Sequence, residues 1–503
     1  MIDKDYNWAV SPLALAKRFS YEEGVVFHAA PHLTLISNAI VDAVYGDGPR
    51  CVAVSMPPQH GKSELISRRT PLWFLVTHPD KIVAVGGYGD DFAKEWGRKV
   101  KNDVTFHKKL LGFDISDDSS AANRWHTTKG GQMWTAGMGG QATGKGADLL
   151  IVDDPVKNYE DAFSKIVRDK VWDEFDASFM TRLRTGAAII IVMTRWHEDD
   201  IVGRLLSGKY GRAEDWREIK LPAIWEENVP DAIGRKKGDP LFPELRPLKE
   251  LEFRKNRHSP EVWEALYQQR PRGETKFGLA YSSYSKENVR DCMRDPTLTL
   301  FVSMDFNVDH MSWVIGQIRD YYTPMAYLTN ERVVEVEILD EVFNDDATTA
   351  NTLPLLLEKL DKLTKTYKPR LEIYGDASGG QRRTSSPSSD WQIVKQFFQN
   401  KNYDVKFYVS SSNPSVRDRV NAVNSALCSA TGQQRLFIDP KCHRLITDLK
   451  EVRWGHDSDG NVRNDLDKRD QSLTHMSDAM GYAVYPKFNF LPTYGEKSGA
   501  LAR

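Results

Sequence analysis

The sequence predicts an α/β protein with two regular parts, the first built on a mainly parallel sheet and the second on a mixed sheet. In the first part, short β-branched runs without inside/outside alternation are separated by helical stretches, a pattern typical of a parallel sheet covered on both faces. In the second part, three consecutive strand-like runs are joined by short connections, which predicts an antiparallel meander. Helices and strands then alternate, so we expect the second sheet to be mixed.

The length of the chain agrees with this division, because 503 residues exceed what one ordinary hydrophobic core accommodates. We predict a first domain over residues 1–245, which includes an N-terminal extension at 1–30. The polar segment 246–295 reads as a linker with one or two helices. A second domain is predicted over 296–490, and residues 491–503 read as a loose tail.

Composition restricts the class of protein. An apolar content of 40% and a charged content of 27% are those of a soluble globular protein, no apolar run reaches the roughly 18 residues of a membrane span, and the N-terminus lacks the pattern of a signal peptide. With a net charge of -2, nucleic-acid binding would require local basic patches. Four cysteines without C-x-x-C spacing argue against a disulfide framework and a zinc site, and fit a reducing cytoplasm. They are Cys51, Cys292, Cys428 and Cys442.

A possible phosphate-binding loop occurs in the stretch SMPPQHGKSELISR, residues 55–68, between a predicted strand and a predicted helix. It resembles the P-loop consensus G-x-x-x-x-G-K-[ST], except that Met56 stands in place of the first glycine. In a P-loop the lysine, here Lys62, reaches the β- and γ-phosphates, and the hydroxyl of Ser63 holds Mg²⁺. An ordinary turn is the alternative for this motif alone. The predicted nucleotide-binding residues are Pro58, Gln59, His60, Gly61, Lys62 and Ser63.

Two further strand ends support the nucleotide site. The run DLLIVDD ends in Asp153 and Asp154 about 90 residues later, and two adjacent carboxylates repel one another unless a cation or water chemistry occupies the space. We expect Asp153 to position Mg²⁺ and Asp154 to polarise the attacking water. The run AAIIIVM ends in Thr194 and Arg195, which could sense the γ-phosphate, although a helix N-cap explains the acidic residues that follow equally well. The three strand ends together predict an ATPase with a mainly parallel sheet.

The second part carries three aspartates at separate positions, Asp305, Asp376 and Asp478. The first two follow predicted strands, and the third lies on a helix whose apolar residues would face the sheet. Each alone is more naturally a structural residue. Three antiparallel strands followed by alternating helices and strands is the RNase H-like order, in which the first and fourth strands are neighbours, so the three carboxylates would meet and bind two Mg²⁺ or Mn²⁺ ions for phosphodiester cleavage. Additional candidate ligands are Glu341 and, more weakly, Asp309 and His475.

Taken together, these motifs resemble those of the large terminase subunits of tailed bacteriophages, over roughly residues 30 to 485. The resemblance rests on the joint order of PPQHGKSE, GGQMWTAGMGGQATGKGADLLIVDDPVKN, TRWHEDDIVGRLL, YQQRP, MDFN, YGDASG, NPSVRDRVNAVN and THMSDAMGY. It implies a RecA/ASCE-like P-loop ATPase domain and an RNase H-like nuclease domain. Lys62 and Ser63 would bind ATP and Mg²⁺, with Asp153 as the Walker B acid. Thr194 and Arg195 would lie in the motif that couples hydrolysis to movement.

The chain departs from the common family pattern at two positions. Many relatives carry glutamate after the Walker B aspartate, whereas this chain has Asp154, so Glu160 remains an alternative for positioning the attacking water. Lys145 stands where many relatives have an arginine of the kind that reaches a neighbouring subunit's ATP site, and lysine offers a point charge in place of a planar fork. The alternatives for this trans-acting role are Arg182, Arg184 and Arg204.

Two basic segments are candidates for DNA binding. Arg382 and Arg383 lie in a loop just after Asp376, and Arg417 and Arg419 lie at a predicted helix start. Contacts of arginine with phosphates position a duplex without reading its sequence. Ordinary surface charges are the alternative.

The resemblance also implies partners and a setting. We expect an ATP-driven motor that moves double-stranded viral DNA into a procapsid and cuts the concatemer. Expected partners are duplex DNA, a small terminase subunit and the portal protein, on which a homopentameric ring would assemble, and no membrane. The setting would be the cytoplasm of an infected bacterium and not the mature virion. The alternatives are another ATP-dependent nucleic-acid enzyme, such as a helicase or repair nuclease, and a non-enzymatic scaffold with degenerate sites.

Overall fold

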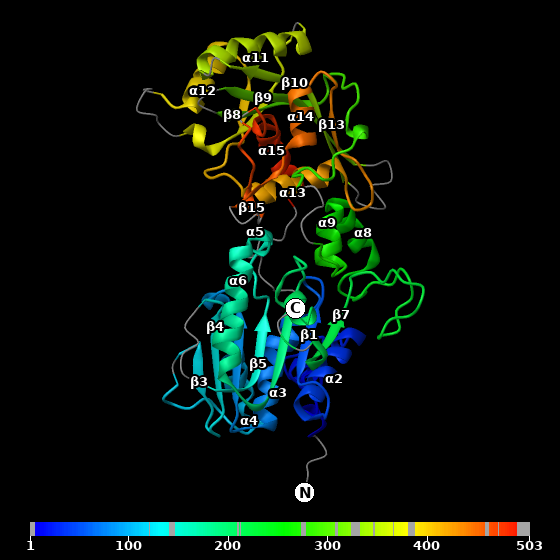
Figure 1. Cartoon of the computed structure of the whole chain (residues 1–503), viewed down its shortest axis with the longest axis vertical. Coiled ribbons are helices and arrows are strands. Elements are labelled where there is room, and N and C mark those ends of the chain that lie inside the picture. Colours follow the sequence, from blue (N-terminus) through cyan, green and yellow to red (C-terminus); the bar gives the residue numbers. More distant parts are fainter. Residues whose placement is uncertain are drawn as a thin grey trace. The chain divides into compact units, whose positions relative to one another are not determined.

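The computed structural model divides the chain into two compact units, each described here by itself (Figure 1). One unit comprises Met1–Phe253 and Glu261–Gly273, and the other comprises Arg254–Pro260 and Glu274–Leu491. The structure describes residues 6–119, 121–139, 146–208, 211, 213–272, 278–306, 310–322, 332–345, 348–365, 367–380, 388–457, 462–470 and 472–489.

The first unit contains a seven-stranded sheet in the order β3-β4-β2-β5-β6-β1-β7. All neighbours are parallel except β3, which is antiparallel to β4. The predicted parallel sheet is therefore confirmed, and β6 separates β1 from β5, as expected of a RecA/ASCE-like domain. The strands are β1 (Cys51–Ser55), β2 (Ile82–Gly87), β3 (Arg124–His126), β4 (Gln132–Gly137), β5 (Ala147–Asp153), β6 (Leu183–Met193) and β7 (Trp216–Lys220).

Both faces of this sheet are buried. On β5, Leu149 and Ile151 pack into one hydrophobic core while Leu150 and Val152 pack into another, because successive side chains of a strand point to opposite faces. This explains why the strand reads as a continuous apolar run. The α-helices are α1 (Pro12–Glu22), α2 (Pro31–Tyr45), α3 (Thr70–Thr77), α4 (Asp90–Leu111), α5 (Tyr159–Phe163), α6 (Lys165–Asp173) and α7 (Ile201–Leu206). Three π-helical segments cover Glu64–Arg69, Glu174–Phe179 and Trp263–Tyr267. In the region predicted as a linker lie α8 (Leu248–Arg257) and α9 (Pro260–Val262).

The second unit contains a six-stranded mixed sheet in the order β12-β11-β8-β9-β10-β13. The meander β8-β9-β10 is antiparallel, and β11 pairs in parallel with β8. The antiparallel meander and the adjacency of the first and fourth strands, here β8 and β11, were predicted from the sequence, and both are confirmed. The strands are β8 (Thr299–Phe306), β9 (Met311–Tyr322), β10 (Arg332–Asn344), β11 (Leu371–Gly375), β12 (Val405–Phe407) and β13 (Leu436–Ile438), and a separate hairpin joins β14 (Trp454–His456) to β15 (Val462–Leu466).

Helices cover both faces of the second sheet. Helices α11 (Thr349–Thr364) and α12 (Asp390–Asn400) contribute to the core on one face. Helices α13 (Val416–Leu427), α14 (His443–Glu451) and α15 (His475–Phe488) contribute to the core on the other, as Figure 1 shows. The polar residues of α15 that enter this core are therefore held close to the strands. Short 3-10 helices cover Tyr6–Ala9, Met180–Arg182, Ala213–Asp215, Lys286–Asn288 and Ala377–Gly380.

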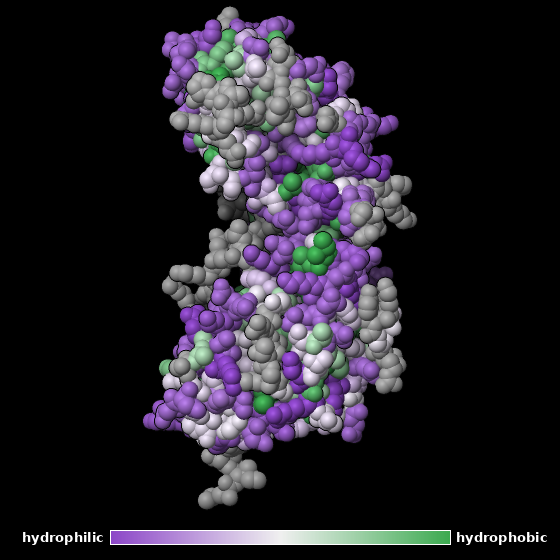
Figure 2. Space-filling view, turned by 60° about the vertical axis from the view of Figure 1, so that its left-hand side comes forward, coloured by the Kyte–Doolittle hydropathy of each residue, from purple (hydrophilic) through white to green (hydrophobic). Residues whose placement is uncertain are grey.

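The surface agrees with the composition. The face shown in Figure 2 is mostly hydrophilic, with small separate hydrophobic patches. Among the described residues, no helix combines the length and the apolar character that a membrane span requires. All four cysteines are free thiols.

Candidate active sites

The phosphate-binding loop predicted from the sequence connects β1 to a helical segment. Met56 continues the pairing of β1 with β6, since its N–H donates to the carbonyl of Met193 at 3.2 Å. Gln59 and Gly61 have φ angles of 61° and 85°, and the left-handed region suits glycine best. At the position of the motif's first glycine, this chain therefore has Met56, which extends the strand pairing. The turn itself is formed by the residues that follow.

The side chains within the loop face different surroundings. His60 is 1% exposed and donates from Nδ1 to the carbonyl of Pro58 at 2.8 Å. Burial lowers the pKa of His32 to about 4, so His32 is neutral and donates from Nε2 to the carbonyl of His60 at 3.0 Å. Gln59 accepts a hydrogen bond from Arg246 at 2.7 Å. The buried His60 ring stabilises the loop from inside.

Lys62 forms an ion pair with Asp154 in the interior of the first unit. Both residues are 6% exposed, and Nζ of Lys62 contacts both carboxylate oxygens. Asp154 has a φ of 41°, a conformation that aspartate tolerates better than most residues. Its Oδ1 also accepts from the backbone N–H of Thr194 at 3.0 Å. The ends of β1, β5 and β6 are thus joined through one carboxylate.

Asp153 contacts the hydroxyl groups of two serines. Ser63 donates to its Oδ1 at 3.0 Å and Ser67 donates to its Oδ2 at 2.7 Å. Burial and the neighbouring Asp154 raise the pKa of Asp153 to about 7, against the attraction of Lys62. Carboxylate and hydroxyl oxygens are suitable ligands for Mg²⁺, and a cation would offset the charge of this buried pair. The residues present therefore fit the metal that the P-loop pattern implies.

Thr194 and Arg195 lie at the end of β6, beside the loop. Thr194 donates from Oγ1 to the carbonyl of Met56 at 3.3 Å. The guanidinium of Arg195 donates from Nε to Asp200 at 2.7 Å, where both side chains are buried. Asp200 also accepts from the N–H of Gly203 at 2.9 Å and caps α7. Asp200 therefore acts as the helix N-cap, as the alternative explanation of this acidic stretch predicted, and it also binds Arg195.

Sequence reasoning missed a role for Gln268 and Gln269, both buried. Gln269 accepts from the backbone N–H of Arg195 at 3.1 Å, and Gln268 bonds both backbone groups of Ile224, at 3.3 and 3.1 Å. The signal was present in the motif YQQRP, because two adjacent amides after an apolar helix need partners when buried. These bonds attach the segment Trp263–Gln269 to the end of β6.

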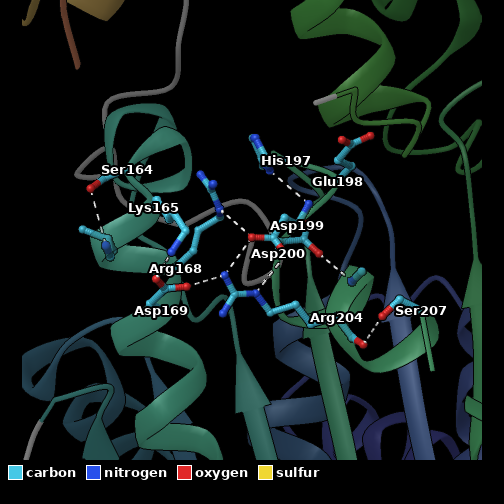
Figure 3. A network of polar contacts seen from close by, with 12 residues as sticks. Ser164, Lys165, Arg168, Asp169, His197, Glu198, Asp199, Asp200, Arg204 and Ser207 are labelled. Carbon is cyan, nitrogen blue, oxygen red and sulfur yellow. Dashed lines mark hydrogen bonds and ion pairs between the residues drawn. The ribbon is translucent and has the colours of Figure 1, made fainter. Parts of the chain in front are cut away.

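The trans-acting candidates occupy different environments. Arg204 is 4% exposed and forms ion pairs with Asp169 at 2.6 Å and Asp199 at 2.7 Å, in a network that also includes Arg168 (Figure 3). These ion pairs hold Arg204 within its own chain, so the structure does not support it as a trans-acting residue. The side chain of Arg184 is 50% exposed, with Asp148 at 3.4 Å, and Arg182 is half-buried. Lys145 lies outside the described residues.

Asp305 and Asp376 lie next to each other at the ends of β8 and β11. The register pairs Met304 with Gly375, and the N–H of Asp376 donates to the carbonyl of Met304 at 3.0 Å. A Cβ atom at Gly375 would lie 2.3 Å from that carbonyl oxygen, so only glycine permits this approach.

The two aspartates have different hydrogen-bond partners. His475 donates from Nδ1 to Asp305 at 3.2 Å. Asp376 accepts from Asn413 at 2.6 Å, from the N–H of Ser378 at 2.7 Å and from its hydroxyl at 2.6 Å.

Asp478 lies on α15 and is 5% exposed. Its Oδ1 accepts from Arg419 at 2.6 Å. Burial raises the pKa of Asp478, Arg419 opposes the rise, and Asp305 adds to it. Burial likewise raises the pKa of Tyr482, against Arg419, and the carboxylates of all three predicted aspartates add to that rise. All three carboxylates therefore contribute to the raised pKa of this one tyrosine.

The fit of this region to a metal pair is limited. Among the described residues, no three His, Cys, Asp or Glu side chains form a group that could hold a metal ion. Glu341 accepts from the N–H groups of Arg444 and Leu445 at 3.0 Å each, so it caps α14. Asp309 lies outside the described residues. The oxygen chemistry suits Mg²⁺ or Mn²⁺, but the arrangement is not that of an assembled metal site.

The prediction of surface arginines for DNA requires a correction. Arg417 and Arg419 are 2% and 4% exposed. Arg417 donates to Asn464 at 2.5 Å and Arg419 donates to Asp478. The helix start was predicted correctly, but the face that carries both guanidinium groups packs into the unit. Arg382 and Arg383 lie outside the described residues.

The fold and the strand-end residues define the class of this protein: a P-loop domain of the RecA/ASCE type followed by a unit with the RNase H-like strand order. Residues 54–263 match the family model described as terminase large subunit, T4likevirus-type, N-terminal. The match confirms the resemblance seen in the sequence over these residues, which make up less than half of the chain. Comparison with the curated proteins gives no match.

Several solved structures are similar to this chain. The large terminase from a thermophilic bacteriophage, in complex with ADP, is 12% identical, with 87% of this chain and 93% of that chain covered and a TM-score of 0.47. The large terminase of bacteriophage HK97 is 12% identical, with coverage of 92% and 95% and a TM-score of 0.34. The nuclease domain of the large terminase from bacteriophage SPP1, with bound Mn, is 11% identical, with coverage of 41% and 97% and a TM-score of 0.26. With TM-scores below 0.5, these similarities carry no part of the assignment.

Proposed function

We propose that the first unit hydrolyses ATP at the carboxyl edge of its parallel sheet. One observation carries this proposal: Lys62 and Ser63, adjacent in the loop, contact Asp154 and Asp153, adjacent at the end of β5. Ligands of open α/β sheets bind outside the carboxyl ends of the strands. Ser63 and Asp153 would hold a Mg²⁺ ion there, which would offset the negative charge of the phosphates.

Each residue of this edge has a role in the proposal. Lys62 exchanges Asp154 for the phosphates when the nucleotide binds, because both partners are anionic. Ser63 and Asp153 hold the metal ion. Asp154 then accepts a hydrogen bond from the attacking water, and Glu160 is the alternative for this step. When Asp154 loses its ion pair with Lys62, the change reaches Thr194 and Arg195 through the hydrogen bond from the backbone N–H of Thr194 to Asp154.

We further propose that hydrolysis drives double-stranded viral DNA into a procapsid and that the second unit cuts the concatemer. The family match supports the packaging function. Asp305, Asp376 and Asp478 are the residues proposed to hold Mg²⁺ or Mn²⁺ for cleavage, supported by the register that brings β8 and β11 together. Metal ions in such sites activate water and stabilise the leaving oxygen.

The proposed partners are duplex DNA, a small terminase subunit and the portal protein, within an infected bacterial cell. A homopentameric ring on the portal would place a basic residue of one subunit at the ATP site of the next. Arg184 suits this role better than Arg204, because half of its side chain is exposed. Arg182 and Lys145 are the remaining candidates.

A helicase with two parallel-sheet lobes is a weaker candidate. Such an enzyme needs a second RecA-like domain, whereas the sheet of the second unit opens with an antiparallel meander. A scaffold with degenerate sites is also weaker, because Lys62 contacts Asp154 and Ser63 contacts Asp153.

A test with purified wild-type protein separates these functions. Phosphate release from ATP is measured with and without duplex DNA, and plasmid cleavage is measured with Mg²⁺, with Mn²⁺ and with EDTA. The proposal predicts both activities, with cleavage abolished by EDTA. ATP hydrolysis without cleavage under any metal would favour a translocase alone, and absence of both would favour a scaffold.

A further inference from the structure

A cavity lies beside the predicted nuclease residues in the second unit. Its volume is about 440 Å³, within the range of about 300–1,000 Å³ that is usual for small-ligand sites. Four tyrosines line it, together with a lysine and a polar loop. The tyrosines are Tyr374, Tyr408, Tyr482 and Tyr485. Tyrosines from a strand end and from α15 thus enclose one space.

The aromatic side chains come from two parts of the unit. Tyr374 on β11 and Tyr408 just after β12 are stacked, with ring centres 5.3 Å apart and an angle of 10° between the rings. Tyr482 and Tyr485 lie three residues apart on α15, so they share one face of that helix. Tyr408 is 40% exposed, which leaves this wall accessible to a ligand.

Two lysines accompany the tyrosines. Lys487 lines the cavity, and the ammonium of Lys406 lies 4.5 Å from the centre of the Tyr408 ring. Aromatic rings that stack on bases, combined with cations that contact phosphates, are the features by which proteins bind unpaired nucleic acid. A bound phosphate would draw Lys406 from the ring and expose that face for stacking.

The cavity adjoins the predicted cleavage residues. Gly375, which lines it, directly precedes Asp376. Asn413, which also lines it, donates to Oδ1 of Asp376 at 2.6 Å. Tyr482 is a further lining residue and lies one helical turn from Asp478 on α15. A nucleotide in this cavity would therefore lie directly beside the site proposed to cut DNA.

We propose that this cavity, the tyrosine pocket, binds one unpaired nucleotide of the DNA strand at the nuclease site, with its base among the tyrosines and its phosphate at Lys406 and Lys487. The proposal rests on the nuclease function proposed above. The strand would be locally unstacked at the cut, which costs more free energy for a paired base than for an unpaired one. Cleavage next to a mismatch or a frayed end is therefore favoured.

The direct test uses the full-length chain and a duplex that carries a single unpaired 2-aminopurine, with Ca²⁺ in place of Mg²⁺ so that the DNA stays intact. Binding of the wild-type protein should quench the fluorescence of this base by stacking. Tyr408→Ala should raise the protein concentration needed for half-maximal quenching by about tenfold, because stacking is worth about 1–3 kcal/mol per base. Tyr408→Trp should retain it. Tyr321→Ala is the control, since Tyr321 is 41% exposed and lies at the end of β9 remote from Asp305.

Each outcome decides between the two proposals. Cleavage of the same duplex is measured separately, with Mn²⁺ in place of Ca²⁺. A chain that binds DNA in Ca²⁺ and cuts it in Mn²⁺, but leaves the probe bright or quenches it equally in Tyr408→Ala, contradicts the pocket and leaves the nuclease standing. Quenching without cleavage supports the pocket and contradicts the nuclease. A chain that binds no DNA contradicts both. Free ATP or dAMP is added in a second arm: displacement of the quenching at micromolar concentration would show that a free nucleotide, and not the DNA strand, is the ligand.

Discussion

Lys62 and Asp154 form a buried ion pair in the first unit. Each charge is compensated mainly by the other, since a charge left alone in the interior is costly. The pair therefore serves two purposes: it stabilises the unit, and it keeps the lysine at the place where the phosphates are proposed to bind.

This ion pair predicts that substitutions of Lys62 and Asp154 have non-additive effects on the free energy of unfolding. Lys62→Ala should destabilise the first unit by about 3–5 kcal/mol, because it leaves a buried carboxylate without its partner. Adding Asp154→Asn should recover part of that loss, which urea unfolding of the single and double variants would measure. Lys81→Ala is the control, since Lys81 is 41% exposed and pairs with Asp148 at 3.6 Å. Additive losses would contradict a direct pair.

The buried carboxyl group of Asp448 predicts that the stability of the second unit depends on pH. Burial and Asp478 raise the pKa of Asp448 to about 7, although its hydrogen bonds with Ser477 lower it. A carboxyl group whose pKa is raised on folding contributes stability that is present below its unfolded pKa near 4 and is lost as the pH rises through 7. The loss amounts to about 1.4 kcal/mol per pH unit in this window.

The corresponding variant is Asp448→Asn, which does not titrate. Its urea midpoint for the second unit should fall less between pH 4 and pH 7 than that of the wild type. Asp404→Asn should leave the wild-type trend unchanged, because the side chain of Asp404 is 76% exposed. An identical decline in Asp448→Asn would assign the pH dependence to other groups.

Much of the first site was predictable from the sequence at the level of single residues. The carboxyl ends of parallel strands meet at one edge of a sheet, so strand-final residues such as Asp153 and Thr194 could be placed together without coordinates. Burial of Arg417 and Arg419 could not be predicted, because a helix pattern does not reveal which polar residues of α13 face a partner. That depends on Asp478 and Asn464, distant in sequence.

Among the elements, the segment Trp263–Gln269 has the clearest connection to the first site. It is held by Gln268 and Gln269 to Ile224 and to the end of β6. Asp154, Thr194, Arg195 and Gln269 therefore form a continuous series of contacts from Lys62 to a segment that lies, in the sequence, between the two stretches of the second unit.

This series predicts the effect of changing Gln269. Gln269→Met preserves volume and removes the bond to Arg195, so it should cost about 1–3 kcal/mol of stability through the unpaired backbone N–H and slow ATP turnover. Gln269→Gly relieves the φ of 55° and separates the effect of backbone strain from that of the lost bond. Calorimetry and phosphate release provide the two measurements. Wild-type turnover in both variants would show that the segment does not influence the site.

The contact between α13 and α15 distinguishes the predicted nuclease aspartates. Asp478→Ala should destabilise the second unit by about 3–5 kcal/mol, because Arg419 would lose its buried partner. Asp376 is only half-buried, and its bonds go to neutral groups, so Asp376→Ala should cost much less. Urea unfolding of both variants measures the difference, and equal losses would contradict the assigned roles. Asp376 is therefore the better position for testing cleavage.

Elements with long apolar runs were predicted well, and short ones were not. The predicted strand before the loop and the predicted strands DLLIVDD and AAIIIVM are observed as β1, β5 and β6, but β3 and β4 were not predicted. β4 is a six-residue run between glycines, Gln132–Gly137, and it becomes a strand by pairing with β2. Pairing of this kind is a property of the tertiary structure and leaves little periodicity in the sequence.

In the whole molecule, the proposed ATPase and nuclease chemistries belong to two separate compact units. The family match covers residues 54–263 and so includes the loop, both acids and the end of β6. The second unit is assigned from its strand order and its aspartates. The central claim is that one chain carries an ATPase and a metal-dependent nuclease whose chemistries are separable.

The most direct measurement compares ATP hydrolysis and plasmid cleavage in Lys62→Ala and Asp376→Ala, each purified as the full chain and shown to be folded by circular dichroism. The account predicts that Lys62→Ala loses ATP hydrolysis at least about 100-fold, the scale of a lost phosphate contact in the transition state, and still nicks plasmid in the presence of Mn²⁺. Asp376→Ala should show the reverse pattern. Undiminished ATP hydrolysis in Lys62→Ala, or undiminished cleavage in Asp376→Ala, would contradict the claim.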